Sequence, residues 1–223
     1  MKKLICLLPI IMLMACSGFT FDFGEIEGRQ YSNNFFDLEI NFPIGWQNLN
    51  QSFTTGEINV NKKSHKKVLD YTTPNKKRKE IDRALLFRTK SMYFSQSCNL
   101  VAINKRNLGY KNGAKLLEDI IWDIESGQKT FLEAGNASVP FQVFDLRGSL
   151  KAQNKKESSE IQELTIAGES FHKMEISTFQ NYGRSTQIYY TLDRSGYILL
   201  FSFANWNDED LSWHKGIMEA MKL

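Results

Sequence analysis

Apolar and polar residues alternate along several stretches of the chain, and a period of two is typical of a β-strand with one buried face. The clearest early example is residues 36–42 (FDLEINF), where an apolar side chain occupies every second position. Residues 84–90 (ALLFRTK) and 100–105 (LVAINK) are further strand candidates. We expect the apolar side chains of residues 36–42 to point to one side, into a core.

The last third of the chain predicts two β-hairpins. Residues 161–179 hold two alternating segments joined at 167–169 (AGE), and residues 186–205 hold two more joined at 193–196 (DRSG). Short turns that contain glycine between alternating segments are a strong local signal for a hairpin.

Two segments instead show the helical period. In residues 112–125 the apolar side chains recur on one face, and Gly127 follows as a plausible stop. These apolar residues are Leu116, Leu117, Ile120, Ile121 and Ile124. Residues 208–223 predict a terminal helix, capped by Asn207 or Asp208 and with acidic residues in its first turn.

Three segments show no sustained period. Residues 16–29 contain three glycines and are interpreted as a tether, although phenylalanines alternate with polar residues at positions 19, 21 and 23. A short strand or a membrane-surface contact is therefore the alternative for that segment. Residues 128–150 predict an edge strand around Pro140, and the charged residues 151–160 predict a loop.

The order of the elements, with a P-x-G-W turn after the first strand and a helix closing the chain, resembles the PsbP-like α/β/α sandwich. The resemblance rests on residues 36–46, 166–171 and 196–203. It implies one α+β domain over residues 30–223, with a mostly antiparallel sheet flanked by helices. The PsbP-like fold occurs in extrinsic proteins of photosystem II, a nuclear-transport factor and many bacterial lipoproteins. Members known to act do so by binding protein partners, so the resemblance implies a binding module with no shared active site.

The N-terminus has the layout of a secretory signal peptide. Lys2 and Lys3 precede 11 apolar residues at positions 4–14, and the small residue Ala15 follows. A membrane-spanning helix needs about 20 apolar residues, so this run is too short to be one. We therefore expect residues 1–15 to be removed.

The residue after the predicted cleavage point is a cysteine. Leu13–Cys16 (LMAC) resembles the bacterial lipobox, in which the cysteine receives a diacylglycerol and becomes the first residue of the mature chain. The resemblance implies a lipoprotein, acylated with palmitate or similar chains on Cys16 and held in the membrane of the cell envelope. Ser17 after the cysteine favours the outer membrane, facing the periplasm. The alternative is an ordinary cleaved signal peptide with a cysteine nearby.

Composition predicts a globular domain and gives little support to nucleic-acid binding. The chain is 42% hydrophobic and 24% charged, and without Lys2 and Lys3 its formal charge falls from +3 to +1. Loss of Cys6 with the signal and acylation of Cys16 would leave Cys98 alone, with no partner for an intramolecular disulfide. We interpret Cys98 as a small packing residue on a strand.

The chain lacks the common signatures of catalysis. His65, His172 and His214 are not paired at a zinc-ligand spacing, and there is no C-x-x-C, G-x-S-x-G, H-E-x-x-H or glycine-rich phosphate loop. Neighbouring carboxylates such as Glu118 and Asp119 are interpreted as solvated charges on a helix. The sequence therefore predicts no catalytic residue, no metal and no cofactor.

One stretch is strongly basic. Residues 62–83 hold nine Lys or Arg against three acidic residues. It is interpreted either as a solvated loop or as a contact for anionic lipid headgroups or an acidic partner, with nucleic acid the least favoured ligand. The candidate contact residues are Lys62, Lys63, Lys66, Lys67, Lys76, Lys77, Arg78 and Lys79.

Two hypotheses follow from these patterns. The first is a non-catalytic binding or assembly module, anchored through lipid on Cys16 and contacting a protein partner in the envelope. The alternative is an envelope enzyme of hydrolase type, whose site assembles only in three dimensions. The sequence leaves the oligomeric state open.

Overall fold

A computed structural model describes residues 21–48, 73–75, 80–92, 96–126, 156–180, 183–206 and 212–223.

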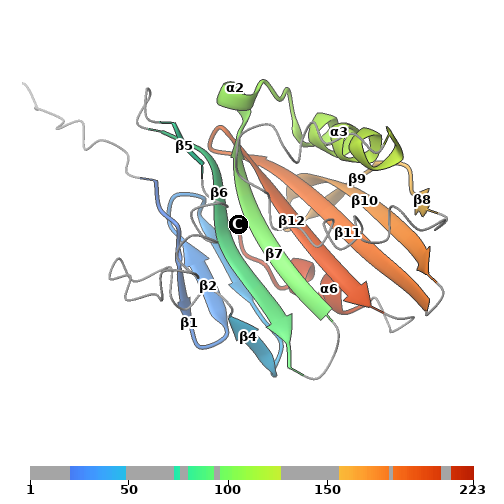
Figure 1. Cartoon of the computed structure of the whole chain (residues 1–223). Coiled ribbons are helices and arrows are strands. Elements are labelled where there is room, and N and C mark those ends of the chain that lie inside the picture. The colour runs from blue at the N-terminus through green and yellow to red at the C-terminus, as the bar shows by residue number, and fades with distance from the viewer. Residues whose placement is uncertain are drawn as a thin grey trace, which may run out of the picture.

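A large antiparallel sheet forms the centre of the molecule (Figure 1). Its strands follow the order β4-β6-β7-β12-β11-β10-β8, while β5 also pairs with β6 and β9 also pairs with β10. The strands are β4 (Trp46–Asn48), β5 (Thr73–Asn75), β6 (Glu80–Ser91), β7 (Gln96–Asn104), β8 (Lys156–Ser158), β9 (Gln162–Ile166), β10 (Glu169–Gln180), β11 (Gly183–Arg194) and β12 (Tyr197–Trp206). Neighbouring strands are antiparallel throughout.

A second, three-stranded sheet is built from the start of the described chain. It consists of β1 (Glu25–Glu27), β2 (Gln30–Asn33) and β3 (Leu38–Asn41) in that order. The chain's end is joined to it, because Glu39 and Lys222 exchange both backbone hydrogen bonds at 3.0 Å.

Helices lie on both faces of the large sheet. The short helix α2 (Lys105–Leu108) follows β7 and leads to α3 (Gly113–Ser126) on one face, and α6 (Trp213–Glu219) lies on the other (Figure 1). Helix α2 is capped by the Asn104 side chain, which accepts a hydrogen bond from the Asn107 backbone at 3.1 Å.

The two faces of the sheet bury two separate apolar cores. On the α3 side, Leu116, Leu117 and Ile120 pack onto alternate residues of the central strands, such as Val101 and Leu200. On the other side, the small sheet and α6 together cover the remaining alternate residues, including Phe87 and Phe201. Strands buried on both faces lose the simple apolar–polar alternation, which explains the nearly continuous apolar run at residues 197–201.

The two hairpins form at the turns that the sequence predicts. The β9–β10 turn has Ala167 at φ 50° and Gly168 at φ 86°, and the β11–β12 turn has Ser195 at φ 50° and Gly196 at φ 81°. Two successive positive φ angles define the tight turn whose twist matches paired strands, and glycine adopts the second without strain.

The predicted fold class is confirmed: the molecule is α+β, with a mostly antiparallel sheet flanked by helices. Residues 36–42 place Phe36, Leu38, Ile40 and Phe42 in one core, as expected. Their strand β3, however, lies in the small sheet rather than in the large one. Strand β3 pairs with the adjacent strand β2, whose sequence shows only a weak alternation of apolar and polar residues.

Three boundaries differ from the expectations. Residues 156–158 of the predicted charged loop form strand β8, because β10 extends past β9 and offers its edge at Ile176 and Thr178. The terminal helix begins at Trp213 with Ser212 as its N-cap position, and the predicted caps at 207 and 208 lie outside the described residues. The predicted edge strand within 128–150 also lies outside them.

The third boundary concerns the predicted tether. Phe21 contacts the rings of Phe35, Phe36 and Tyr197 at centroid distances of 5.4–5.9 Å, and Tyr31 donates a hydrogen bond to the Phe23 carbonyl at 3.0 Å. Residues 21–29 therefore belong to the domain. The alternating phenylalanines do not form a strand in the described residues 21–24, because β1 begins only at Glu25, and a tether would be confined to the residues before Phe21.

Candidate functional site

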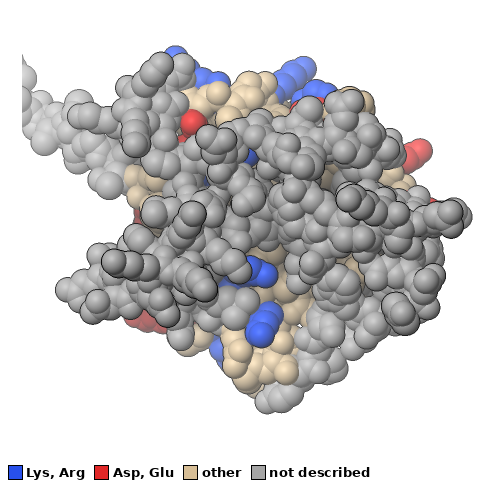
Figure 2. Space-filling model, viewed as in Figure 1, with Lys and Arg blue, Asp and Glu red and all other residues tan. Residues whose placement is uncertain are grey.

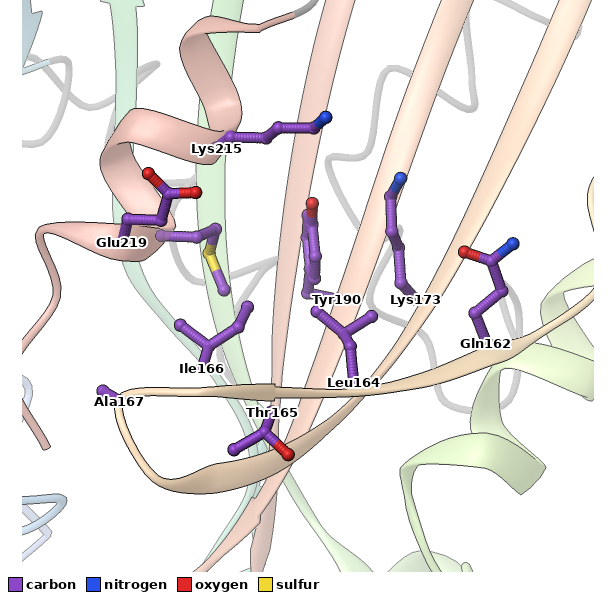
Figure 3. A pocket seen from close by; sticks show the side chains of 10 residues that line it. Gln162, Leu164, Thr165, Ile166, Ala167, Lys173, Tyr190, Lys215 and Glu219 are labelled. Carbon is purple, nitrogen blue, oxygen red and sulfur yellow. The ribbon is translucent and has the colours of Figure 1, made fainter.

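A pocket of about 520 Å³ opens between the β9–β10 hairpin and helix α6 (Figure 3). Strands β10 and β11 form its floor, β9 forms one wall and α6 forms the opposite wall. Its lining residues are Gln162, Leu164, Thr165, Ile166, Ala167, Lys173, Tyr190, Lys215, Met218 and Glu219.

One part of the pocket is apolar. Leu164 and Ile166 occupy alternate positions of β9, so both side chains point to the pocket side of the hairpin. Met218 of α6 is buried and also lines the pocket. A half-exposed apolar wall of this kind is the usual lining of a ligand pocket.

Polar side chains reach the same space from three elements. Lys173 and Tyr190 are directly paired across β10 and β11, and Lys215 extends from α6. In Figure 3 the Lys215 ammonium reaches across the pocket towards the Tyr190 hydroxyl and the Lys173 ammonium. The Lys173 Nζ atom lies 6.0 Å from the centroid of the Tyr190 ring.

The surroundings of the Tyr190, Lys173 and Lys215 side chains determine their protonation and ion pairing. Burial, with smaller contributions from Glu175 and Glu219, raises the pKa of Tyr190 well above its usual value, so the phenol stays protonated and can donate a hydrogen bond. Lys173 forms an ion pair with Glu175 at 2.5 Å. Among the described residues, the Lys215 ammonium has no ion-pair partner.

This arrangement places charged and polar groups beside an apolar wall. The described lining residues offer two ammonium groups, one phenol, one amide and one carboxylate around an apolar wall. They include neither a histidine nor a cysteine, and the Thr165 hydroxyl points away from the space in which the other polar groups gather (Figure 3).

Cys98, His172 and His214 do not line the pocket, although His214 packs against the ring of the pocket residue Tyr190. Cys98 is fully buried on β7, where burial raises the pKa of its thiol, so it is confirmed as a packing residue. His172 is half-buried on β10, and His214 is buried against the rings of Tyr190 and Phe203 at centroid distances of 5.9 Å. The structure does not bring these two histidines together with a third ligand, and the residues that it describes contain no cluster of metal-ligating side chains.

The carboxylate pair on α3 is confirmed as solvated charge. Lys115 contacts Glu118 at 3.2 Å and Asp119 at 2.9 Å, and all three side chains are at least one-third exposed. No described helix is long and apolar enough to cross a membrane.

The predicted lipid-attachment residue Cys16, His65 and all eight candidate contact residues of the basic stretch lie outside the described residues. They stay predictions. Of the basic residues counted there, only Arg83 is described, and it is buried on β6 rather than exposed. On the face seen in Figure 2, the described Lys and Arg side chains form small separate groups.

A buried polar region lies on the opposite face of the sheet. Asn99 donates a hydrogen bond to the Ser202 hydroxyl at 3.2 Å, and Tyr189 donates one to Gln187. All four residues are buried, and burial raises the pKa of Tyr189. The first pair joins β7 to β12 and the second lies within β11, so both are internal hydrogen bonds of the sheet.

The sequence did not single out Lys173, Tyr190, Lys215 or Glu219. A weak signal exists in β10, where Lys173 lies on the same side of the strand as the buried Phe171. A lysine among core-facing positions indicates that the core is interrupted there. The other residues come from elements that only the tertiary structure brings together.

Neither a protein-family model nor a curated protein matches this chain. Among solved structures, the solution structure of cyanobacterial PsbP (CyanoP) from Synechocystis sp. PCC 6803 is similar at a TM-score of 0.48 and 8% identity, over 95% of this chain and 98% of that one. The crystal structure of LpqN, involved in cell envelope biogenesis of Mycobacterium tuberculosis, is similar at a TM-score of 0.35 and 13% identity, over 83% and 82%.

Proposed function

We propose that this protein is a non-catalytic binding module of the bacterial cell envelope, tethered to the membrane by lipid on Cys16. The site of binding is the pocket between the β9–β10 hairpin and α6. The domain holds a ligand or partner close to the bilayer, and the lipid keeps it there.

The observation that carries the binding role is the composition of the pocket. Hydrogen-bond donors from β10, β11 and α6 meet beside an apolar wall, and the one carboxylate in the lining is on α6. Such a pocket provides affinity through apolar contact and orientation through a few polar groups.

The support for the anchor is the lipobox resemblance at Leu13–Cys16. Two or more acyl chains give stable attachment, because each buried methylene contributes about 0.8 kcal/mol. The serine at position 17 favours the outer membrane as the destination. Because residues 21–29 belong to the domain, only a few residues would separate the lipid from the folded part.

Photo-crosslinking in intact cells tests the binding role. A photoreactive amino acid is placed at Gln162, an exposed residue at the pocket rim. A matched control places it at Trp122, which is 48% exposed on α3 on the opposite face of the sheet. We expect a light-dependent adduct, identified by mass spectrometry, from position 162 and none from position 122.

Equal adducts at the two positions, or none at 162, would contradict a binding role for the pocket. Steady conversion of a small molecule by the purified protein, lost on substitution of pocket residues, would instead support the enzyme alternative.

A further inference from the structure

We propose that the pocket binds an amphipathic molecule with a single anionic group, a carboxylate or a phosphate, next to an apolar portion. This inference rests on the proposed function, since it names the class of ligand for the same pocket.

The preference for an anion follows from the donors. The Lys215 ammonium, the Tyr190 hydroxyl and the Lys173 ammonium gather on one side of the pocket (Figure 3). All three are hydrogen-bond donors at neutral pH, and charge-assisted bonds to a carboxylate or phosphate are stronger than neutral ones. Tyr190 is 3% exposed and its ring packs against Phe203 and His214, so the ring is held in place.

The limit to a single anionic group follows from the acidic groups nearby. Glu175 already neutralises much of the Lys173 charge at 2.5 Å, and Glu219 faces the pocket from the same helix as Lys215. A second anionic group would therefore meet a carboxylate rather than a further ammonium. The pocket is unsuited to polyanions.

The apolar portion follows from β9 and α6. Leu164 and Ile166 are only partly buried and lie against the same core as Met218, so a ligand's apolar part would cover surface that now faces solvent. Each Å² of apolar surface removed from water contributes about 25 cal/mol. The volume of about 520 Å³ lies in the range of small-molecule sites, roughly 300–1,000 Å³.

Matched single-chain amphiphiles test this inference. The mature chain from residue 16, carrying Cys16→Ser so that it has no lipid, is titrated by calorimetry with decanoate, decyl phosphate, decyl maltoside and decyltrimethylammonium. All are used below the concentrations at which they aggregate. We expect the two anions to bind at least tenfold more tightly than the neutral and the cationic amphiphile. The tighter anion then distinguishes a fatty-acid carboxylate from a phospholipid phosphate.

Variants locate the binding. Lys215→Gln and Tyr190→Phe each remove one hydrogen-bond donor from the pocket. Each should weaken the binding of decanoate or decyl phosphate roughly fivefold or more. Lys115→Gln, an exposed lysine on α3, is the control and should have no effect. Because Tyr190 is buried, thermal unfolding of each variant is measured, and Lys215→Gln on the surface of α6 decides the result if Tyr190→Phe fails to fold.

Equal binding of anionic and neutral amphiphiles, or unchanged affinity in Lys215→Gln, overturns the inference. If no amphiphile binds while cellular adducts still form at position 162, the ligand class is wrong and the binding role stands. Failure of both experiments removes the proposed function as well.

Discussion

At the scale of single residues, Gly113 shows how closely α3 approaches the sheet. A Cβ atom added at Gly113 would lie 2.2 Å from the Thr191 Oγ1 atom and 2.6 Å from its Cβ atom. Gly113 begins the helix, and its backbone nitrogen faces the Asp193 carboxylate at 3.4 Å. The absence of a side chain is what allows the first turn of α3 to lie against β11.

We predict that Gly113→Ala destabilises the domain by about 1–3 kcal/mol, the usual cost of inserting a group into a packed site. Gly216→Ala on α6 is the matched control, because nothing lies within 4 Å of a Cβ atom there. Alanine is the better helix former, so this variant should gain about 0.5–1 kcal/mol. Urea unfolding measures the free energy of unfolding of both variants. Equal changes in the two variants would contradict the close approach of α3 to β11.

At the scale of elements, the C-terminal residues are fastened to β3. Lys222 pairs with Glu39 through two backbone hydrogen bonds of 3.0 Å and through a side-chain bond of 2.8 Å to the Glu39 carboxylate. The side-chain hydrogen bond from Lys222 is the main cause that lowers the pKa of Glu39, with the Lys222 charge second. This contact ties α6, and thus one wall of the pocket, to the small sheet.

We predict that Lys222→Gln raises the pKa of Glu39 towards its ordinary value of 4.5, as measured by NMR titration of the side-chain carboxyl. A carboxyl group whose pKa is lower in the folded state than in the unfolded state stabilises the fold at pH values above its unfolded-state pKa. This stabilisation is lost as the pH falls through its folded-state pKa. The stability difference between wild type and Lys222→Gln should therefore be constant near neutral pH and shrink below about 4.5. Lys115→Gln should leave the Glu39 titration unchanged, and a Glu39 pKa that does not respond to Lys222→Gln would contradict the contact.

Elements with a local signal were predictable from the sequence. Apolar and β-favouring segments of the sequence predicted β6, β7 and the two hairpins. The apolar face of α3 was visible in the sequence because its residues contact a single core. The division into two sheets was not predictable, because β3 pairs with β2 nearby but packs against strands more than 40 residues later. Strand β8 was missed because its three residues are polar and depend on a free edge of β10.

The candidate site was harder to predict than the fold. Its residues come from positions 162 to 219, and only the pairing of β10 with β11 and the docking of α6 bring them together. A lysine, a tyrosine and a second lysine at these distances in sequence form no motif. The predicted anchor, by contrast, is a contiguous motif that needs no tertiary structure to be noticed.

At the scale of the whole molecule, the basic stretch stays a prediction about orientation at a membrane. Each Lys or Arg near an anionic surface contributes about 1 kcal/mol, an effect that fades over a Debye length of about 8 Å at physiological salt. We predict that the Cys16→Ser mature chain binds anionic liposomes at low salt and releases them at high salt. A chain starting at Gln30 is unsuitable, because it lacks β1 and the packed rings of Phe21 and Phe23.

The corresponding variant changes seven lysines of the stretch to glutamine and should lose liposome binding without a change in thermal unfolding. They are Lys62, Lys63, Lys66, Lys67, Lys76, Lys77 and Lys79. If wild type and variant bind equally, or neither binds, the stretch is a solvated loop.

The central claim is that lipid on Cys16 holds a binding domain at the membrane, and metabolic labelling with radioactive palmitate tests it most directly. The wild-type chain should incorporate label and sediment with membranes, and Cys6→Ala should do the same, because that cysteine is removed with the signal. Cys16→Ala should incorporate none and should stay unprocessed or become soluble. A wild-type chain that takes up no palmitate and is recovered from the periplasm without detergent would contradict the claim.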